Sequence, residues 1–366
     1  MSGSTFGNIF KITTWGESHG KGVGVVVDGC PAGLPLCEED IQLYLNRRKP
    51  GQSKFTTPRN EDDEVEILSG IFEGKTTGTP ISMVVWNKNQ KSKDYSEIAS
   101  YYRPGHADFC FDAKYGFRDY RGGGRSSGRE TIGRVAAGAI AAKLLKQMNI
   151  DFLTYTKSIG PVSIDSTKFD KDEINNNSLY MPDKDAAQEA ESYLEECLHN
   201  RNSAGGIAEC IVTGLPVGLG DPVFDKIDAN LAKAIMSIGA VKGFEIGDGF
   251  DVSASTGLSN NDAFVMNNGK ITKATNHSGG TLGGMTDGSP LIFRAAFKPT
   301  PSIASLQKTV NKSDEEIEIS IKGRHDPIIV PRAIVVVEAM AALVIADALL
   351  CNMTSKVDSI IDFYKK

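Results

Sequence analysis

The apolar segment from Ala333 to Leu350 constrains the fold more than any other part of the chain. Pro331 stands just before it, at a position suited to the first turn of a helix. Glu338 and Asp347 interrupt the apolar run, and carboxylates are unfavourable in the hydrocarbon core of a bilayer. We therefore predict a helix buried in the core of a globular protein rather than a membrane span.

Charge and cysteine content limit the kinds of partner. The chain has 366 residues, enough for one large domain or two ordinary ones, and a net charge of -6. Nucleic acids and anionic membranes need a broad excess of positive charge, so both are excluded as general partners. The six cysteines form no C-x-x-C and no Cys/His pairs at zinc spacing, so no disulfide framework and no metal site is predicted. The N-terminus lacks a signal-peptide pattern, which predicts a cytoplasmic protein.

The apolar pattern predicts a mixture of strands and helices. Strands are expected at residues 8–14, 24–28, 65–72, 81–86, 151–164, 207–212 and 316–322. Helices are expected at residues 38–48, 128–148, 183–200, 225–238, 302–310 and 331–350. These elements alternate without regular βαβ spacing, which favours an α+β fold with largely antiparallel sheets. No internal repeat is evident.

The stretch from Tyr115 to Arg134 concentrates positive charge, with five arginines at positions 118, 121, 125, 129 and 134. Its three consecutive glycines, 122–124, let main-chain N–H groups approach a ligand, and Ser127 with Glu130 fits a capping box that opens a helix. A helix N-terminus favours an anion, so we predict an anionic ligand here. The alternative is a tight turn and a capped helix with solvated arginines.

Two histidines lie in turns. His19 follows the first expected strand, and His106 lies in the turn from Arg103 to Asp108. A lone histidine in a turn is more often structural than catalytic, although its pKa suits proton transfer. Further glycine-rich or basic loops follow at residues 276–284, 298–302 and 323–327.

Six segments, in order, resemble those of the chorismate synthase family. They are Gly16–Gly20, Arg103–Asp108, Arg121–Ser127, His277–Gly284, Lys298–Ser302 and Gly323–Pro327. The resemblance covers nearly the whole chain. It implies an anti-1,4-elimination of phosphate from 5-enolpyruvylshikimate 3-phosphate to give chorismate, the last step of the shikimate pathway, with reduced FMN required but not consumed. It also implies a β-α-β sandwich, a single domain over residues 1–366, and a homotetramer.

The resemblance also implies roles for individual residues. The implied catalytic residues are His19 at the leaving phosphate, His106 for protonation of the reduced flavin and Asp326 for the proton at flavin N5. Arg48, Arg134 and Arg332 are implied to bind the substrate, whose phosphate and two carboxylates suit guanidinium groups. The implied flavin site comprises Arg125, Ser126, Ser127, Gly239, Ala240, Gly283, Lys298, Pro299, Thr300, Pro301, Ser302 and Arg324.

Some features depart from this family or suit other functions. Lys54 stands where the family often has arginine, and lysine lacks the planar fork of that side chain. No G-x-G-x-x-G pattern follows an expected strand, so NADPH is expected only as an indirect reductant, through an external flavin reductase. The loop at residues 122–127 would also suit a small-molecule kinase that holds ATP phosphates. An RNA-binding module would use the same arginines with Tyr115, Phe117 and Tyr120 as stacking partners.

Overall fold

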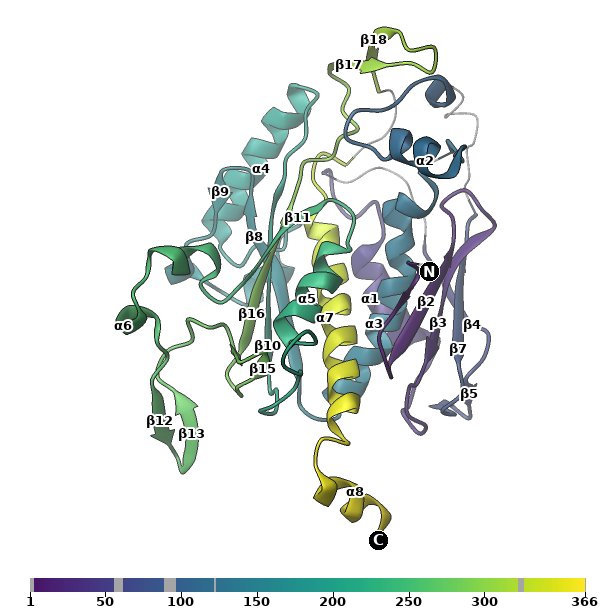
Figure 1. Cartoon of the computed structure of the whole chain (residues 1–366). Helices are drawn as coiled ribbons and strands as arrows, with labels where there is room; N and C mark the ends of the chain where they lie inside the picture. Colours follow the sequence, from purple (N-terminus) through teal and green to yellow (C-terminus); the bar gives the residue numbers. More distant parts are fainter. Residues whose placement is uncertain (1–2, 56–61, 89–96, 122, 322–325, 366) are drawn as a thin grey trace.

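The computed structural model describes residues 3–55, 62–88, 97–121, 123–321 and 326–365. Two five-stranded sheets lie on either side of a layer of helices (Figure 1). The strand order is β1-β2-β3-β7-β4 in the first sheet and β11-β16-β10-β8-β9 in the second. The strand pairs within both sheets are antiparallel. The predicted α+β sandwich is confirmed.

The elements have the following bounds. The first sheet consists of β1 (Thr5–Phe6), β2 (Lys11–Gly16), β3 (Gly22–Asp28), β4 (Val65–Ile67) and β7 (Ile81–Trp86). The second consists of β8 (Asp151–Ile159), β9 (Val162–Ser163), β10 (Gly206–Thr213), β11 (Val241–Ile246) and β16 (Leu291–Phe297). The helices between them are α1 (Glu38–Arg48), α3 (Thr131–Lys146), α5 (Ile227–Met236) and α7 (Val330–Asn352). The other α-helices are α2 (Asp108–Tyr115), α4 (Lys184–His199), α6 (Gly257–Asn260) and α8 (Val357–Tyr364). Small hairpins are formed by β5 (Ile71–Phe72) with β6 (Lys75–Thr76), β12 (Phe264–Asn267) with β13 (Lys270–Lys273), β14 (Thr281–Leu282) with β15 (Met285–Thr286), and β17 (Leu306–Val310) with β18 (Glu316–Ser320).

Burial of side chains alternates along the strands with a period of two residues, so one face of each sheet packs against the helices. In β16 alternate residues, from Leu291 through Phe293 to Phe297, are buried, and those between them are half-buried. Gly24 of β3 pairs with Trp15 of the neighbouring strand β2, and this position requires a glycine because an added Cβ would lie 2.3 Å from the Trp15 ring. Both sheets therefore bury one face against the central helices.

The predicted core helix is α7, and every residue from Ala333 to Asp347 in it is buried. By length and composition α7 could cross a membrane, but 78% of its most apolar window is buried inside the protein. It packs along α3, and the two helices approach closely at Gly138, where an added Cβ would lie 2.3 Å from the Cβ of Ala339. The core helix is confirmed.

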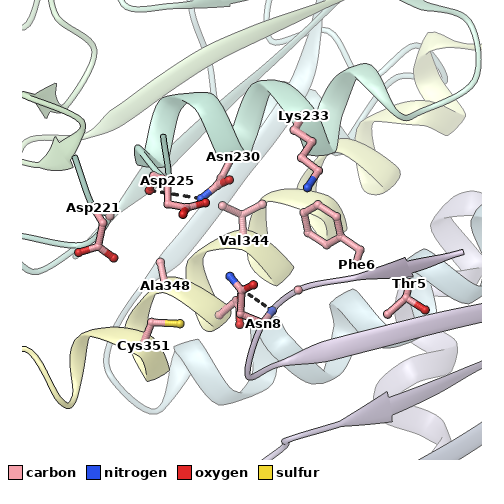
Figure 2. Close-up of a pocket in the computed structure, with 13 residues that line it drawn as sticks. Thr5, Phe6, Asn8, Asp221, Asp225, Asn230, Lys233, Val344, Ala348 and Cys351 are labelled. Carbon is pink, nitrogen blue, oxygen red and sulfur yellow. Dashed lines mark hydrogen bonds between the residues drawn. The ribbon is translucent and has the colours of Figure 1, made fainter. Parts of the chain in front are cut away.

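The two acids within α7 both have specific partners. Glu338 receives two hydrogen bonds from Arg47 of α1, at 2.8 and 2.7 Å. Asp347 accepts from the backbone N–H groups of Asn8, Ile9 and Phe10 at 2.9, 2.7 and 3.0 Å. Figure 2 shows this end of the helix, where Asn8 lies at a cavity of about 160 Å³ between α5, α7 and the N-terminal segment. Glu338 thus joins α7 to α1, and Asp347 joins it to the segment between β1 and β2 of the first sheet.

We expect Asp347→Ala to lower the free energy of unfolding by about 3 kcal/mol, because it leaves three backbone donors without their carboxylate. Urea unfolding at pH 7 measures this loss. Asp225→Ala, which removes another acid lining the same cavity, is the control and should change stability by less than about 0.5 kcal/mol. Equal losses for the two variants would contradict the assignment.

The structure reveals an internal duplication that the sequence did not make evident. Four strands of the first sheet, in the spatial order β2-β3-β7-β4, correspond to β8-β10-β16-β11 of the second, and the chain forms both sets in the same sequence order. A short sequence pattern occurs once in each half, at Gly74–Ile81 and at Gly284–Leu291. In both segments every second residue matches, in the order glycine, threonine, glycine, proline. The hydroxyl of Thr76 donates to a proline carbonyl and accepts from a leucine N–H, and Thr286 makes the same two contacts. The proline and leucine partners also lie in matching segments, because Pro31–Leu34 and Pro216–Leu219 both have glycine at the third place.

Two local predictions were wrong. Residues 302–310 do not form a helix: β17 pairs with β18 as a hairpin, and Asn311 closes its loop by accepting from the N–H groups of Ser313 and Glu315. The capping box is also absent, because Ser127 accepts from the N–H of Arg129, while the Glu130 side chain turns to other partners. Tertiary contacts outweighed local propensity in both cases. Helix α2 was not predicted at all.

Candidate active site

Four central helices bring one end each to the same region of the protein. Arg48, at the C-terminus of α1, donates from Nε to the hydroxyl of Thr131 at the start of α3, at 2.9 Å. Arg134 of α3 donates to the hydroxyl of Ser237 just after α5, at 2.6 Å. Arg332 in the first turn of α7 donates to the carbonyl of Arg48, at 3.1 Å. The three arginines implied to bind substrate therefore lie in one connected cluster.

Each arginine of this cluster also contacts a carboxylate. The pairs are Arg48 with Asp63 at 2.6 Å, Arg134 with Glu130 at 2.8 Å and Arg332 with Asp326 at 2.5 Å. The acids reduce the repulsion between neighbouring guanidinium groups and restrict their rotamers. The N-terminal ends of α3 and α7 lie in the same region, and the helix dipole makes each of these ends partly positive. The arrangement suits a small ligand with several anionic groups.

The turn carrying His106 lies against the loop at residues 298–302. His106 Nδ1 lies 3.0 Å from the carbonyl of Pro104, and Nε2 lies 2.9 Å from the hydroxyl of Ser302. Lys298 donates to the carbonyl of Gly105 at 2.8 Å. A carbonyl can only accept, so Nδ1 carries the proton of the neutral ring and Nε2 accepts from Ser302. Burial, with a smaller effect of Arg103, lowers the pKa of His106 to about 4.

This low pKa makes stability depend on pH. Below pH 6.5 the unfolded chain binds a proton at His106 that the folded chain does not, so stabilisation is lost as pH falls toward 4. We expect wild type to lose about 2 kcal/mol more stability than His106→Asn between pH 7 and pH 5. Urea unfolding at the two pH values measures the difference. Parallel pH dependence of both proteins would contradict the lowered pKa.

The loop at residues 298–302 is fixed by several neighbours. The N–H of Lys298 donates to the carbonyl of Ala240 at 2.9 Å, and Ala240 has a positive φ of 72°. The hydroxyl of Ser203 donates to the carbonyl of Thr300 at 2.7 Å. The hydroxyl of Thr300 itself is buried and has no hydrogen-bond partner among the residues described. A buried polar atom of this kind fits a site completed by a polar ligand.

Arg125 connects the glycine-rich loop to the end of β2. Its guanidinium donates to the hydroxyl of Thr14 at 2.7 Å and to the carbonyl of Gly16 at 3.1 Å. Ser126 donates back to the carbonyl of Gly123 at 2.8 Å. The turn that follows β2 carries His19, whose Nδ1 lies 3.2 Å from the hydroxyl of Ser18. The loop at residues 123–127 and the His19 turn are therefore neighbours.

Within this chain one implied flavin contact, Gly283, lies away from the loop at residues 298–302. Gly283 lies in the turn between β14 and β15, which precedes β16, whereas Lys298 directly follows β16. Seven residues of strand at about 3.3 Å each separate these places by roughly 20 Å. Beside Gly283, Gly284 packs so closely that an added Cβ would lie 2.3 Å from the Lys226 side chain, which indicates a structural turn. Arg324 lies outside the described residues.

Four side chains whose roles the sequence left open have partners of their own. These partners are Asp112 for Arg118, Asp119 for Arg121, Glu195 for Lys54 and Asp248 for His277. Arg118 is buried and also donates to the carbonyls of residues 98 and 101, which explains it as a structural residue. The contact of Lys54 is an exposed ion pair and contributes little to stability.

Sequence reasoning missed the polar residues that orient this cluster, chiefly Asp63, Asn87 and Glu130. Asp63 has a fully buried side chain and contacts both Arg48 and Arg129. In the sequence Asp63 and Asn87 stand in polar segments typical of exposed loops, and Glu130 fits a helix cap. The available signal was the excess of arginines over acids near position 125, since buried arginines need acceptors.

Comparison with known proteins decides the family. The sequence model for chorismate synthase matches residues 10–350. The chain belongs to the chorismate synthase family. A chorismate synthase of Agathobacter rectalis is 80% identical over 366 residues, all of both chains. One of Methanosarcina mazei is 54% identical and covers 96% of this chain and 97% of its own. The resemblance found in the sequence is confirmed.

A solved structure supports the same conclusion at the level of fold. A crystal structure of a chorismate synthase superposes with a TM-score of 0.77 at 31% identity, covering 98% of this chain and 97% of that one. Among the described residues, no group of three or more His, Cys, Asp or Glu side chains could hold a metal ion. This chain therefore has the fold of a chorismate synthase together with the arginine cluster described above.

Proposed function

We propose that the chain is a lyase that converts 5-enolpyruvylshikimate 3-phosphate into chorismate and phosphate. The observation that carries the proposal is the cluster of Arg48, Arg134 and Arg332, assembled from three helices in a member of this family. The substrate has a phosphate and two carboxylates, anionic groups that form charge-assisted hydrogen bonds with guanidinium donors. The kinase and RNA-binding alternatives find no support in the family match.

The elimination breaks one C–O bond to phosphate and one C–H bond and forms a C=C bond. The departing phosphate is a better leaving group when it is protonated, and we propose His19 as the acid. His19 lies in the turn after β2, and the neighbouring Arg125 donates to the end of that strand. Arg48 and Arg134 would hold the substrate, and Arg332 would also orient Asp326.

The residues beside His106 fit FMN. Lys298 offers positive charge, Ser302 and the unpartnered hydroxyl of Thr300 offer hydrogen bonds, and the carbonyl of Ala240 holds the backbone of Lys298. We propose that Arg125 adds a second positive charge from the glycine-rich loop. When bound, reduced FMN supplies the reducing chemistry and is recovered at the end of each turnover. An anionic group bound beside His106 would raise the pKa of the ring from about 4. The ring would then take up a proton only when the site is filled. We propose that Asp326 holds the proton exchanged at flavin N5.

Several wider features belong to the same proposal. We propose a single domain over residues 1–366, because α3 contacts β2, β3 and β7 of the first sheet and β8 of the second. We also propose a cytoplasmic homotetramer. Its flavin would be reduced by an external flavin reductase, with NADPH as an indirect reductant, since the sequence has no dinucleotide-binding fingerprint after a strand.

An anaerobic assay tests the function. The purified protein is mixed with 5-enolpyruvylshikimate 3-phosphate and chemically reduced FMN, and phosphate and chorismate are followed together. We expect equal amounts of both products and no reaction with oxidised FMN. Folded protein without turnover would contradict the proposal. Consumption of ATP with Mg²⁺ in a parallel reaction would favour the kinase.

A further inference from the structure

The turn that carries His19 is held by the side chain of Asn87, which follows β7 in the neighbouring part of the first sheet. Asn87 Nδ2 donates to the carbonyl of Gly20 at 2.8 Å and to the carbonyl of Glu17 at 3.1 Å. The backbone N–H of Asn87 donates to the carbonyl of Lys21 at 3.0 Å. Asn87 thus contacts the chain on both sides of His19 and closes the turn.

The orientation of this amide is determined by its other end. Asn87 Oδ1 accepts from Nε of Arg129 at 2.6 Å. Arginine has donors and no acceptor, so the oxygen of the amide must face Arg129 and the NH₂ group must face the His19 turn. All donors and the acceptor of the amide are then used. The turn can change shape only if these bonds break.

Arg129 is itself fixed by Asp63. Its Nη1 donates to Asp63 Oδ1 at 2.9 Å, and the side chains of Arg129 and Asp63 are 12% and 0% exposed. The second carboxylate oxygen of Asp63 accepts from Arg48 at 2.6 Å. A continuous series of hydrogen bonds therefore runs from the arginine cluster through Asp63, Arg129 and Asn87 to the His19 turn.

We propose that Asn87 is a positioning residue that holds His19 in place for proton transfer, with Arg129 and Asp63 fixing the direction of its amide. The proposal rests on the proposed function, in which His19 protonates the leaving phosphate. Asn87 acts through the turn, since its contacts are to the backbone at residues 17, 20 and 21. Because a misplacement of about 1 Å can cost roughly 100-fold in rate, loss of this clamp should affect turnover strongly.

The test variant is Asn87→Asp, which keeps the shape and the acceptor for Arg129 but replaces the NH₂ donor with an oxygen that repels two carbonyls. We expect kcat to fall by about 10- to 100-fold, while KM for 5-enolpyruvylshikimate 3-phosphate and the Kd for FMN change by less than about twofold. A general loss of structure would instead change all three quantities. Thermal unfolding of each variant reports whether the protein is folded.

A double-mutant cycle with His19→Ala makes the test specific. If Asn87 acts through His19, Asn87→Asp should lower kcat by less than about twofold when His19 is already alanine. Additive losses in the double variant would overturn the proposal, as would a kcat of wild-type size for Asn87→Asp. If Asn87→Asp is poorly folded, Arg129→Lys tests the same series of bonds, and the same non-additivity is expected.

Asn177→Asp is the matched control. Asn177 also donates from its amide to two backbone carbonyls, those of Glu173 and Met181, but in a loop without any implied site residue. It should leave kcat unchanged, and a loss equal to that of Asn87→Asp would overturn the proposal. Absence of turnover in wild type would instead overturn the proposed function itself, so the two failures give different results.

Discussion

Gly138→Ala is expected to destabilise the folded chain by about 3 kcal/mol, although alanine in place of glycine normally favours a helix by about 1 kcal/mol. The added Cβ would lie 2.3 Å from the Cβ atom and 2.5 Å from the α-carbon of Ala339, so α3 and α7 would have to separate. These helices form the centre of the sandwich, and their separation would loosen packing on both sheets. Urea unfolding and the yield of soluble protein measure the effect.

Two further variants make this prediction specific. Gly257→Ala in α6 meets nothing within 4 Å and should change stability by less than about 0.5 kcal/mol. Combining Gly138→Ala with Ala339→Gly removes the overlap with the methyl group of residue 339 but leaves the overlap with its backbone, so only part of the loss should return. Full stability of Gly138→Ala alone would show that the two helices are not packed as described.

His19→Ala is expected to lower kcat by about 10²- to 10⁴-fold, the usual contribution of a general acid. The Kd for FMN should change by less than about twofold, because the flavin site is proposed around the loop at residues 298–302. Stopped-flow measurement of phosphate release gives kcat, and flavin fluorescence gives the Kd. His199→Ala, at the exposed end of α4, should behave like wild type. A His19→Ala variant as fast as wild type would remove the role of His19 as the acid.

Much of the architecture could be predicted because its signals are local. Helix α1 has the predicted bounds, residues 38–48, since acids begin it, arginines end it and Pro50 follows. The apolar run of α7 was sufficient to place it in the core. The helix predicted at residues 302–310 was wrong because it rested on a single serine that suggested an N-cap. The strand found there forms by pairing with residues 316–320, a contact outside the segment itself.

The site was predicted less completely, because contacts between distant segments decide it. The family resemblance pointed to His106, Lys298 and Ser302. In the structure Ser302 contacts His106, and Lys298 contacts the neighbouring Gly105. It gave no reason to select Asn87, which stands in a polar segment 68 positions after His19. The pairing of β3 with β7 brings Asn87 to the His19 turn, where its amide forms hydrogen bonds with the backbone.

The sequence by itself determined the α+β class, the core position of α7 and the concentration of arginine near position 125, because hydrophobic period and charge are properties of neighbouring residues. Only the tertiary structure decided which acid accompanies each arginine, that Gly283 and Lys298 lie toward opposite ends of β16, and that Asn87 closes the His19 turn. Those contacts join residues far apart in the chain, and a hydrogen bond forms only where folding brings donor and acceptor to about 3 Å.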